Sequence, residues 1–450
     1  MNKRELIAIL FEKGKIAGLS DMEVYIQGGK EFDIKIFKGE IDKYSISSEE
    51  GLSFRGVYNG KMGYSYTEKI DETSVDMLIQ DAIDNARAID SEDEEEILEG
   101  SKEYKHIEVF NQSLESISPS EKIEFTKLLE QEALKLDKRV VAVYDCLYGE
   151  QSSYRMLVNT KGLDLKSKSN MAHAYISVML KDGEDVKTAD KYIIGNDFSM
   201  FDAKVLAQEA VKEAISMLGA DSIESEEYPV ILRNNVAADI MEAFIPVFIA
   251  ENVQKDISLL KGKLGEKIAN SLITIVDDPF MENGVASCGF DGEGVSTIYK
   301  KIVDKGVLKT FLHNSKTAKK DGIESTGNAH KGSYKSPISI SPSNMYIENG
   351  TTSYEEIVKS TEKGLLIIDV QGLHSGLNTI SGDFSLSAYG YLIENGEIER
   401  PVNQITIAGN FYEMINDIEA VGNDLKFTLP GFGYIGSPTL KIKKLSISGK

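Results

Sequence analysis

Five acidic side chains gather in one polar stretch of the second half of the chain. They are Asp277, Asp278, Glu282, Asp291 and Glu293. Carboxylates grouped in this way could ligate a hard cation. The stretch fails the EF-hand pattern, because Phe280 occupies what would be the second ligand position after Asp278. Asp277-Asp278-Pro279 is also typical of a strand end followed by a turn, so a structural and a metal-binding interpretation both stay open.

A second polar stretch, Thr326–His330, is a Gly-containing loop of the kind that often carries ligand-binding residues. We take Asn328 and His330 as candidate substrate-binding residues, although a single loop histidine is more often structural. No two histidines stand three to five residues apart, so the sequence has no zinc-helix signature. It also lacks GxSxG, P-loop and GxGxxG motifs, which argues against acyl transfer and against nucleotide or dinucleotide binding.

The Gly-rich block Gln371–Asn410 predicts the sheet core of the C-terminal half. Asn395-Gly396 lies between two alternating apolar runs, and this dipeptide is the strongest short-range signal for a hairpin. Before the hairpin, Gly382, Asp383 and Ser385 bring glycine and polar side chains into a strand context, where a backbone can approach a ligand closely. These three residues are further substrate-binding candidates.

The segment Val236–Glu251 is apolar on nearly all sides, which predicts a buried helix. Pro246 removes one backbone hydrogen bond within it and predicts a kink or a break. Glu242 is the charged residue in the middle of this segment. A buried carboxylate needs a partner or a raised pKa, which makes Glu242 a candidate functional residue beside its structural interpretation.

The overall composition excludes several classes of partner. A formal net charge of −22 argues against binding to nucleic acid, whose phosphates would be repelled. The two cysteines, Cys146 and Cys288, form no CxxC pattern and fit a reducing cytosol. No run of residues approaches the roughly 18–20 apolar positions of a membrane span. We therefore expect a soluble, cytoplasmic protein that contacts neither nucleic acid nor membrane.

The periodicity of the chain predicts an α+β protein with two domains, 1–220 and 221–450. In the first, an α/β domain, a helix, several strands and a second helix occur twice in succession. We hypothesise that residues 3–90 and 119–219 are two related halves. The second domain has one long helical stretch followed by many short strands with glycine turns, which predicts a mostly antiparallel β domain, barrel-like or sandwich.

Several segments together resemble the TldD/PmbA (modulator of DNA gyrase) family, in the same order and over nearly the whole chain. The matching pieces are Gly51–Tyr66, Asn159–Leu165, Tyr228–Leu232, Asp277–Pro279, Phe290–Gly294, Ser325–His330 and Gly382–Asn410. The resemblance implies a zinc metallopeptidase family with two branches. Chains of the TldD branch look like the catalytic ones, with an HExxxH motif on a helix and a C-terminal cysteine as a further ligand.

This chain departs from that motif where it matters. The matching helix reads Met241 to Pro246, so neither histidine position carries a zinc ligand, and Glu242 alone is retained at the general-base position. The C-terminal cysteine is also absent, since residues 427–437 read FTLPGFGYIGS. The chain therefore resembles the PmbA (TldE) branch, and the resemblance implies that it holds no metal of its own.

The resemblance implies that the chain functions as one subunit of a complex. A TldE-like chain pairs with a TldD-like, zinc-bearing subunit, and the pair degrades or processes extended peptides and unfolded segments in the cytoplasm. Two alternatives stay open. One is an autonomous metal-dependent hydrolase whose metal is held by Asp277, Asp291 or His330. The other is a homodimeric peptide-binding protein without chemistry.

Overall fold

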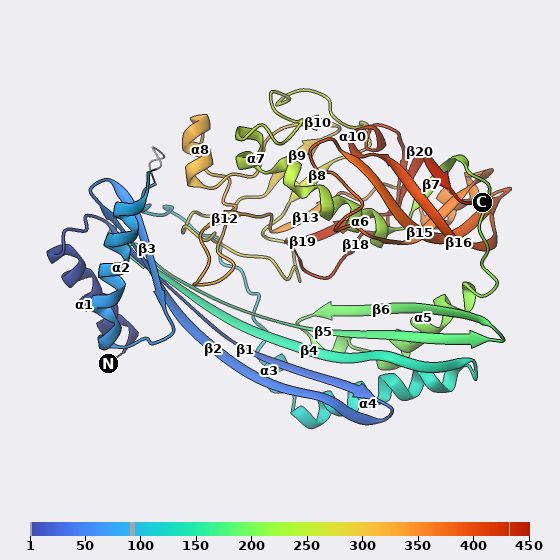
Figure 1. The fold of residues 1–450 in the computed structure, drawn as a ribbon, viewed down its shortest axis with the longest axis horizontal. Helices are drawn as coiled ribbons and strands as arrows, with labels where there is room; N and C mark the ends of the chain where they lie inside the picture. Colours follow the sequence, from blue (N-terminus) through green and yellow to red (C-terminus); the bar gives the residue numbers. More distant parts are fainter. Residues whose placement is uncertain (1, 91–94, 432) are drawn as a thin grey trace.

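The computed structural model describes residues 2–90, 95–431 and 433–450. It confirms the α+β class: a long curved sheet from the N-terminal half and a β-rich C-terminal half above its concave face (Figure 1). The acidic run at residues 91–96 predicts a solvated boundary, and its residues 91–94 lie outside the described ranges, which include Glu95 and Glu96. No helix among the described residues is long and apolar enough to cross a membrane.

The N-terminal half builds one six-stranded sheet with the order β3-β2-β1-β4-β5-β6. Every neighbouring pair in it is antiparallel, and β1 meets β4 at the centre. The outer pairs β2–β3 and β5–β6 therefore lie on opposite sides of the β1–β4 contact, and the hypothesis of two related halves stays a prediction. The strands are β1 Met22–Phe37, β2 Glu40–Tyr58, β3 Lys61–Thr67, β4 Val140–Asn159, β5 Asp164–Asp182 and β6 Asp185–Gly195.

These strands are longer than the sequence predicts. The sequence pattern suggests one strand before Gly28-Gly29 and another after it. In the structure, β1 is a single strand that continues through both glycines. Glycine is needed here because the ring of Tyr154 on β4 lies against Gly28, only 2.7 Å from where a Cβ would stand. The glycines therefore make room for a neighbouring strand rather than forming a turn.

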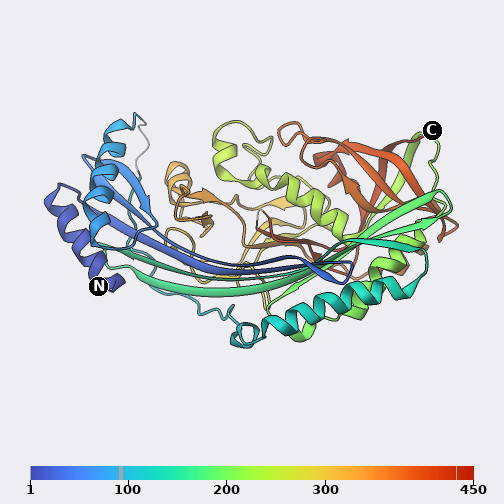
Figure 2. The same ribbon diagram turned by 60° about the horizontal axis from the view of Figure 1, so that its bottom comes forward.

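Four main helices cover the two ends of this sheet. α1 (Lys3–Ile16) and α2 (Val75–Ala88) pack at one end, and α4 (Pro119–Leu136) and α5 (Ala203–Ser216) at the other. Figure 2 shows α4 on the face of the sheet opposite to the C-terminal half. The sequence Ser118-Pro119-Ser120-Glu121 predicts a capping box, and α4 has it: Ser118 accepts from the Glu121 backbone, and Glu121 accepts from the Ser118 backbone. α3 (Gln112–Glu115) is a single turn in the connection between the two groups.

The C-terminal half contains a closed barrel, which confirms the barrel-like prediction. Its sheet has the order β16-β15-β14-β7-β20-β17, and β16 also pairs with β20, so that β7, β14, β15, β16 and β20 form a ring. Asn395 and Gly396 turn β15 into β16 with φ of 52° and 75°, as an Asn-Gly hairpin requires. The strands are β7 Glu226–Leu232, β14 Lys363–Gln371, β15 Asp383–Glu394, β16 Glu397–Asn410, β17 Ile418–Val421 and β20 Leu440–Ser448.

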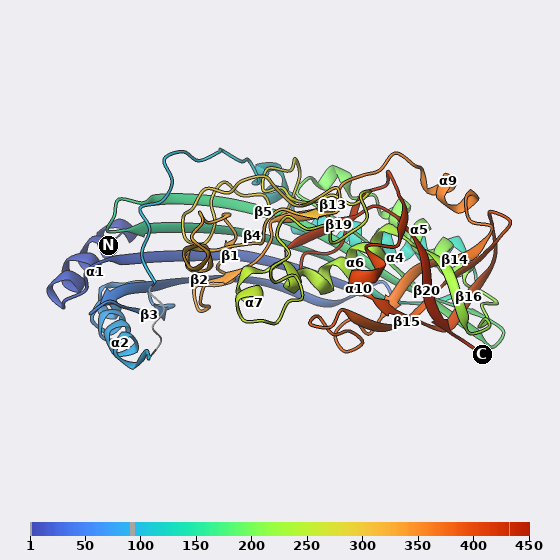
Figure 3. The same cartoon turned by 90° about the horizontal axis from the view of Figure 1, so that it is seen from above.

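A second sheet lies beside the barrel (Figure 3). Its strand order is β10-β9-β8-β13-β19-β18, and β11 pairs with β12 separately. The strands are β8 Ile275–Asp277, β9 Lys300–Asp304, β10 Val307–Leu308, β11 Ala329–His330, β12 Ser339–Ile340, β13 Asn344–Ile347, β18 Lys426–Phe427 and β19 Tyr434–Ser437. The short helices of this half are α8 Ser315–Asp321, α9 Tyr354–Lys359 and α10 Phe411–Met414.

The predicted long helix of the second half is broken at Pro246. α6 (Asn234–Phe244) passes into a 3₁₀ turn at Ile245–Phe248 and then into the short helix α7 (Ala250–Gln254). Phe244 is fully buried and stacks on Phe411 of α10 at 4.4 Å between ring centroids. The helix is therefore a core element of the C-terminal half, as its apolar pattern predicts.

Candidate functional site

A cleft of about 370 Å³ lies between the N-terminal sheet and the C-terminal half. The sheet contributes Tyr25 and Gln27 from β1, Arg155 from β4 and the stretch 167–169 of β5. The C-terminal half contributes residues 285–289, 327–332, 341–343, Asp291, Gly431 and Gly433. Oε1 of Gln27 is buried without a hydrogen-bond partner among the described residues, so an unused acceptor lies in the cleft wall.

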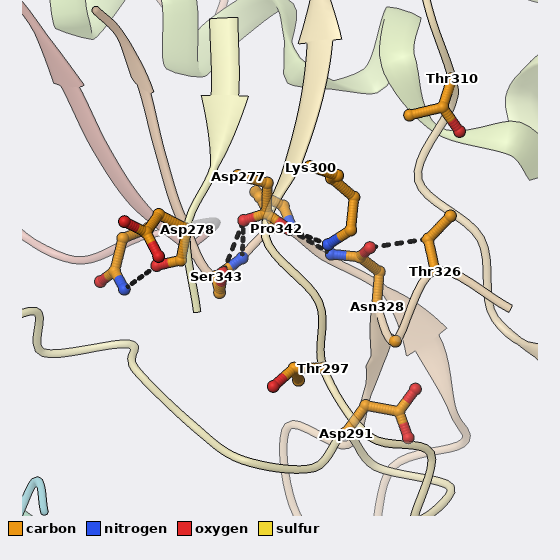
Figure 4. A network of polar contacts seen from close by, with 12 residues as sticks. Asp277, Asp278, Asp291, Thr297, Lys300, Thr310, Thr326, Asn328, Pro342 and Ser343 are labelled. Carbon is orange, nitrogen blue, oxygen red and sulfur yellow. Dashed lines mark hydrogen bonds and ion pairs between the residues drawn. The ribbon is translucent and has the colours of Figure 1, made fainter. Parts of the chain in front are cut away.

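The wall of the cleft rests on a buried polar network around Asp277 (Figure 4). Asp277 ends β8 and is fully buried. Its Oδ2 lies 2.8 Å from Nζ of Lys300 on β9, and its Oδ1 accepts from the backbone N–H and the hydroxyl of Ser343 at 2.7 and 2.6 Å. A buried carboxylate needs such partners, and here lysine supplies the compensating charge.

Asn328 connects this network to the loop that borders the cleft. Its side-chain N–H₂ donates to Asp277 Oδ2 at 2.8 Å and to the carbonyl of Ser341 at 3.1 Å. Its side-chain oxygen accepts from the Thr326 hydroxyl at 2.7 Å. The Asn328 amide therefore positions the loop, and its neighbour His330 carries the side chain that solvent reaches.

His330 stands at the end of β11 and lines the cleft. Solvent reaches its imidazole, yet surrounding protein and the positive charge of Arg155 lower its pKa below the usual value. The Arg155 guanidinium is held in place by the Ser167 hydroxyl and by the carbonyl of Phe290, at 2.9 and 2.5 Å. The neutral imidazole can both donate and accept a hydrogen bond to a bound molecule.

Asp291 and Glu293 stabilise the neighbouring loop by accepting hydrogen bonds. They lie outside the hydrogen-bond network around Asp277. Asp291 accepts backbone N–H bonds from Glu293, Val295 and Ala329 at 2.9, 2.9 and 3.1 Å. Burial and the negative charge of Glu293 raise the pKa of Asp291 to about 7. Glu293 in turn accepts from the backbone and hydroxyl of Ser315 at the start of α8, at 2.9 and 2.7 Å.

The two remaining acidic candidates are Asp278 and Glu282, which follow β8 in the chain. Asp278 accepts from the backbone N–H of Phe280 at 2.9 Å, and Glu282 is exposed. Among residues 2–90, 95–431 and 433–450, no three His, Cys, Asp or Glu side chains converge to hold a metal ion. Of the five acidic residues singled out in the sequence, Asp277 thus belongs to a buried ion pair, Asp291 and Glu293 accept hydrogen bonds in one loop, and Glu282 is exposed.

The candidates in the Gly-rich block lie elsewhere. Gly382 has a φ of 86°, and a Cβ there would stand 2.6 Å from the ring of Tyr412. Asp383 accepts from the Asn410 side chain at 2.9 Å and from the Ser381 hydroxyl at 2.8 Å. Ser385 is exposed on β15. None of these three residues lines the cleft that holds Asn328 and His330.

Glu242 lies on α6, where the loop after β18 crosses it. The Thr428 hydroxyl donates to its Oε2 at 3.4 Å, and a Cβ at Gly431 would stand 2.3 Å from its Oε1. Met241 is 3% exposed and belongs to the hydrophobic core of the C-terminal half. Pro246 lies in the 3₁₀ turn beyond the helix. This donor set does not fit zinc, which takes imidazole, thiolate and carboxylate ligands in a tetrahedral arrangement.

Sequence reasoning missed several residues that shape the site. Nothing in the sequence around Lys300 indicates that its ammonium lies 2.8 Å from the carboxylate of Asp277. Arg155 and Gln27 lie on strands of the first half, and only the curvature of the sheet brings them to the second half. The signal that the sequence did carry is the polar loop Thr326–His330, which does border the cleft.

Comparison with known proteins finds members of one family that match nearly the whole chain. Models for the PmbA/TldA metallopeptidase match in three parts: domain 1 at residues 22–86, the central domain at 112–218 and the C-terminal domain at 225–449. The metalloprotease PmbA of Escherichia coli O157:H7 is 27% identical over 418 residues, which cover 91% of this chain and 89% of that protein.

Solved structures share the fold. A putative modulator of a DNA gyrase from Thermotoga maritima superposes with a TM-score of 0.92 at 34% identity, covering 99% of this chain and all of that one. TldE from Thermococcus kodakarensis superposes with a TM-score of 0.91 at 25% identity and the same coverage. The architecture described above is therefore shared along the whole chain.

Proposed function

The chain belongs to the PmbA/TldA metallopeptidase family, and from that premise we propose that it is the non-catalytic subunit of a two-component protease. Its partner would be a TldD-like chain that carries the HExxxH motif and the zinc ion. Together they would degrade or process extended peptides and unfolded segments in the cytoplasm. In this proposal the chain itself needs no cofactor.

The observation that carries the proposal is the state of α6. Met241 packs in the hydrophobic core, and Pro246 lies beyond the end of the helix, in a 3₁₀ turn. Glu242 accepts a hydrogen bond from Thr428 and lies under Gly431. The residue types at 241 and 246 supply no ligand that zinc prefers, so Glu242 would have no metal-bound water to activate.

The cleft supports the substrate class. It lies between the N-terminal sheet and the short strand β11 with its neighbouring loops, and its lining combines glycine-containing loops with Gln27 and His330. Extended peptides present a regular series of amide donors and acceptors that suits such a polar surface. A folded protein would not enter a hollow of about 370 Å³. The substrate would therefore be a peptide or an unfolded segment.

Co-purification tests the pairing. The full chain is expressed with a tag beside the HExxxH-bearing family member of its own genome, and the complex is isolated and weighed by light scattering. We expect a stoichiometric complex of the two chains. A chain that forms only homodimers and retains no sister chain would favour a homodimeric peptide-binding protein and would refute the proposal.

A further inference from the structure

A second cavity, of about 490 Å³, lies beyond the loop 331–338 from the cleft just described. Its walls come from β2 and β3 of the N-terminal sheet and from α7 and α8 of the C-terminal half. Among the described residues along these walls, lysine and arginine outnumber aspartate and glutamate, although the chain as a whole carries a net charge of −22. Four of the lysines pair with carboxylates: Lys255 with Glu251, Lys316 with Glu95, Lys319 with Glu96 and Lys335 with Glu68. Lys331 differs from these lysines, because its ammonium donates to neutral oxygens, and its positive charge can attract an anionic ligand.

Arg55 of β2 lines this cavity and is 9% exposed. Its Nε donates to Glu23 Oε1 at 2.7 Å, across the β1–β2 pair. Its Nη2 is buried and has no hydrogen-bond partner among the described residues, and the same holds for Glu23 Oε2. A buried guanidinium N–H without an acceptor is costly, which points to an acceptor supplied by a bound molecule.

Lys331 lies beside this orphaned group and separates the two cavities. It lines both of them, and its Nζ donates to the Tyr64 hydroxyl at 3.0 Å and to the carbonyl of Ser336 at 2.8 Å. Its ammonium also lies 4.5 Å from the centroid of the Tyr64 ring. Burial and the nearby charge of Arg55 lower the pKa of Lys331 to about 7, against the opposing effect of Glu23.

A small void lies between the side chains of Arg55 and Lys331. It measures about 10 Å³, and Glu23, Arg55, Tyr64 and Lys331 line it. This volume accommodates about one water-sized group. Arg55, Tyr64 and Lys331 line the large cavity as well, so the void opens beside it.

We propose that Arg55 and Lys331 form a carboxylate-binding subsite in which one oxygen of a peptide carboxylate occupies this void and the rest of the peptide extends into the basic cavity. The free Nη2 of Arg55 donates to the carboxylate, and Lys331 donates a further charge-assisted bond. The proposal rests on the proposed function for the peptide nature of the ligand, and it makes the subunit an anchor for peptide ends or acidic side chains.

The acidic groups nearby limit the strength of the subsite. Glu23 neutralises part of the Arg55 charge, and Glu293 and Glu95 also act on Arg55 from the other walls. The hydrogen bonds of the Lys331 ammonium go to neutral oxygens, so its protonation decides whether the void is attractive to an anion. A bound carboxylate would in turn raise the pKa of Lys331, and binding near pH 8 would take up a proton.

Calorimetric titration of the full chain with three tetrapeptides tests the subsite. One has a free C-terminal carboxylate, one is its C-terminal amide, and one is an amide with glutamate in the last position. At pH 6.5 we expect the free acid to bind at least tenfold more tightly than the plain amide. Tight binding of the glutamate peptide would extend the ligand class to acidic side chains, and weak binding would restrict it to the C-terminus.

Variants distinguish specific binding at the subsite from a general effect of positive charge in the cavity. Lys331→Met is expected to bring the acid-to-amide ratio below three, whereas Lys331→Arg keeps the ratio at pH 8.5, where the unaltered chain loses it. Glu23→Gln with Arg55→Gln removes the guanidinium while leaving a neutral pair, and should also abolish the preference. Lys335→Met is the matched control, since Lys335 lines the cavity but pairs with Glu68 at 2.6 Å.

Two results would overturn the subsite. One is equal binding of acid and amide within twofold at pH 6.5 by a chain whose circular dichroism is native. The other is an equal loss of preference in Lys335→Met and Lys331→Met. Both experiments use the chain without its partner, so failure of the subsite leaves the proposed pairing standing, and failure of the pairing leaves these binding ratios interpretable.

Discussion

Gly431 lies directly over the carboxylate of Glu242, so that a Cβ at position 431 would stand 2.3 Å from Glu242 Oε1. The glycine loop therefore closes over the only member of the zinc motif that this chain retains. Glu242 also accepts from the Thr428 hydroxyl at 3.4 Å on the same loop. The geometry ties Glu242 to the C-terminal loop and suits a structural role for this carboxylate.

Replacing Glu242 with glutamine tests that role. In the complex with a zinc-bearing partner, we expect Glu242→Gln to change kcat/KM for peptide cleavage less than threefold, because the amide keeps the shape and can still accept from Thr428. A general base normally contributes about 10²–10⁴-fold. The corresponding substitution in the HExxxH motif of the partner is the matched control and should abolish cleavage. A hundredfold loss in Glu242→Gln would show that this side chain takes part in the reaction.

Asp277 should contribute strongly to stability through Lys300. Asp277→Asn removes the charge that compensates a buried lysine, and breaking a buried ion pair in this way costs about 3–5 kcal/mol. Equilibrium unfolding in urea should show this loss in the free energy of unfolding. The control is Asp304→Asn, since the Lys301–Asp304 pair at 3.0 Å is partly exposed and should be worth less than about 1 kcal/mol.

The pair can be separated from the hydrogen-bond network by a second variant. Lys300→Met in addition to Asp277→Asn removes both charges and leaves the introduced amide oxygen to accept from Ser343. We expect the double variant to recover part of the stability lost in Asp277→Asn. If the double variant is less stable than the single one by the full cost of Lys300→Met alone, the two side chains are not coupled.

Carboxylates at the junction of the two halves should make stability depend on pH. Burial raises the pKa of Asp239 on α6 to about 7, with further contributions from the negative charges of Asp369 and Glu242. Burial likewise raises the pKa of Asp369 on β14 to about 6. The folded state then binds more protons than the unfolded state between about pH 4 and pH 7, so the free energy of unfolding falls as pH rises through this window.

Asp239→Asn tests this effect, because it places a permanently neutral group at the same site. We expect the variant to be more stable than the unaltered chain at pH 8, by about 1 kcal/mol or more, since one pKa unit corresponds to about 1.4 kcal/mol. The profile between pH 5 and pH 8 should also become flatter. Equal slopes in the two proteins would show that Asp239 does not titrate in this window.

Gly51 should be required for the contact between β2 and the loop 331–338. A Cβ at Gly51 would stand 2.2 Å from the ring of Tyr334, which is 2% exposed. Gly51→Ala should therefore displace the ring, lower the free energy of unfolding by about 1–3 kcal/mol and speed proteolysis of the loop. Tyr334→Ala removes the obstacle, so Gly51→Ala should cost much less in that background. Additive costs would contradict the contact.

The sequence predicts local turns and helix ends well, because nearby residues determine them. Asn395-Gly396 and the capping box of Ser118 and Glu121 occur as expected. The length of the strands depends instead on partners far along the chain. Gly149, for example, lies inside β4 and pairs with His173 on β5, whose imidazole lies 2.3 Å from where a Cβ of residue 149 would be.

The candidate site was predictable only where its residues are contiguous. The loop that contains Asn328 and His330 borders the cleft, since one short segment carries both residues. Gly382, Asp383 and Ser385 lie outside it: Gly382, just before β15, accommodates the ring of Tyr412, and Asp383 accepts from Asn410 and Ser381. Gln27 and Arg155 could not be foreseen, because they reach the cleft through the pairing and curvature of the whole N-terminal sheet.

The most direct test of the central claim measures zinc and peptide cleavage in the same samples. The isolated chain, the HExxxH-bearing sister chain and their mixture are analysed for bound metal by mass spectrometry and for cleavage of an unfolded peptide. The account predicts no stoichiometric zinc and no cleavage in the isolated chain, with cleavage in the mixture that a chelator removes. Stoichiometric zinc together with peptidase activity in the isolated chain would contradict it.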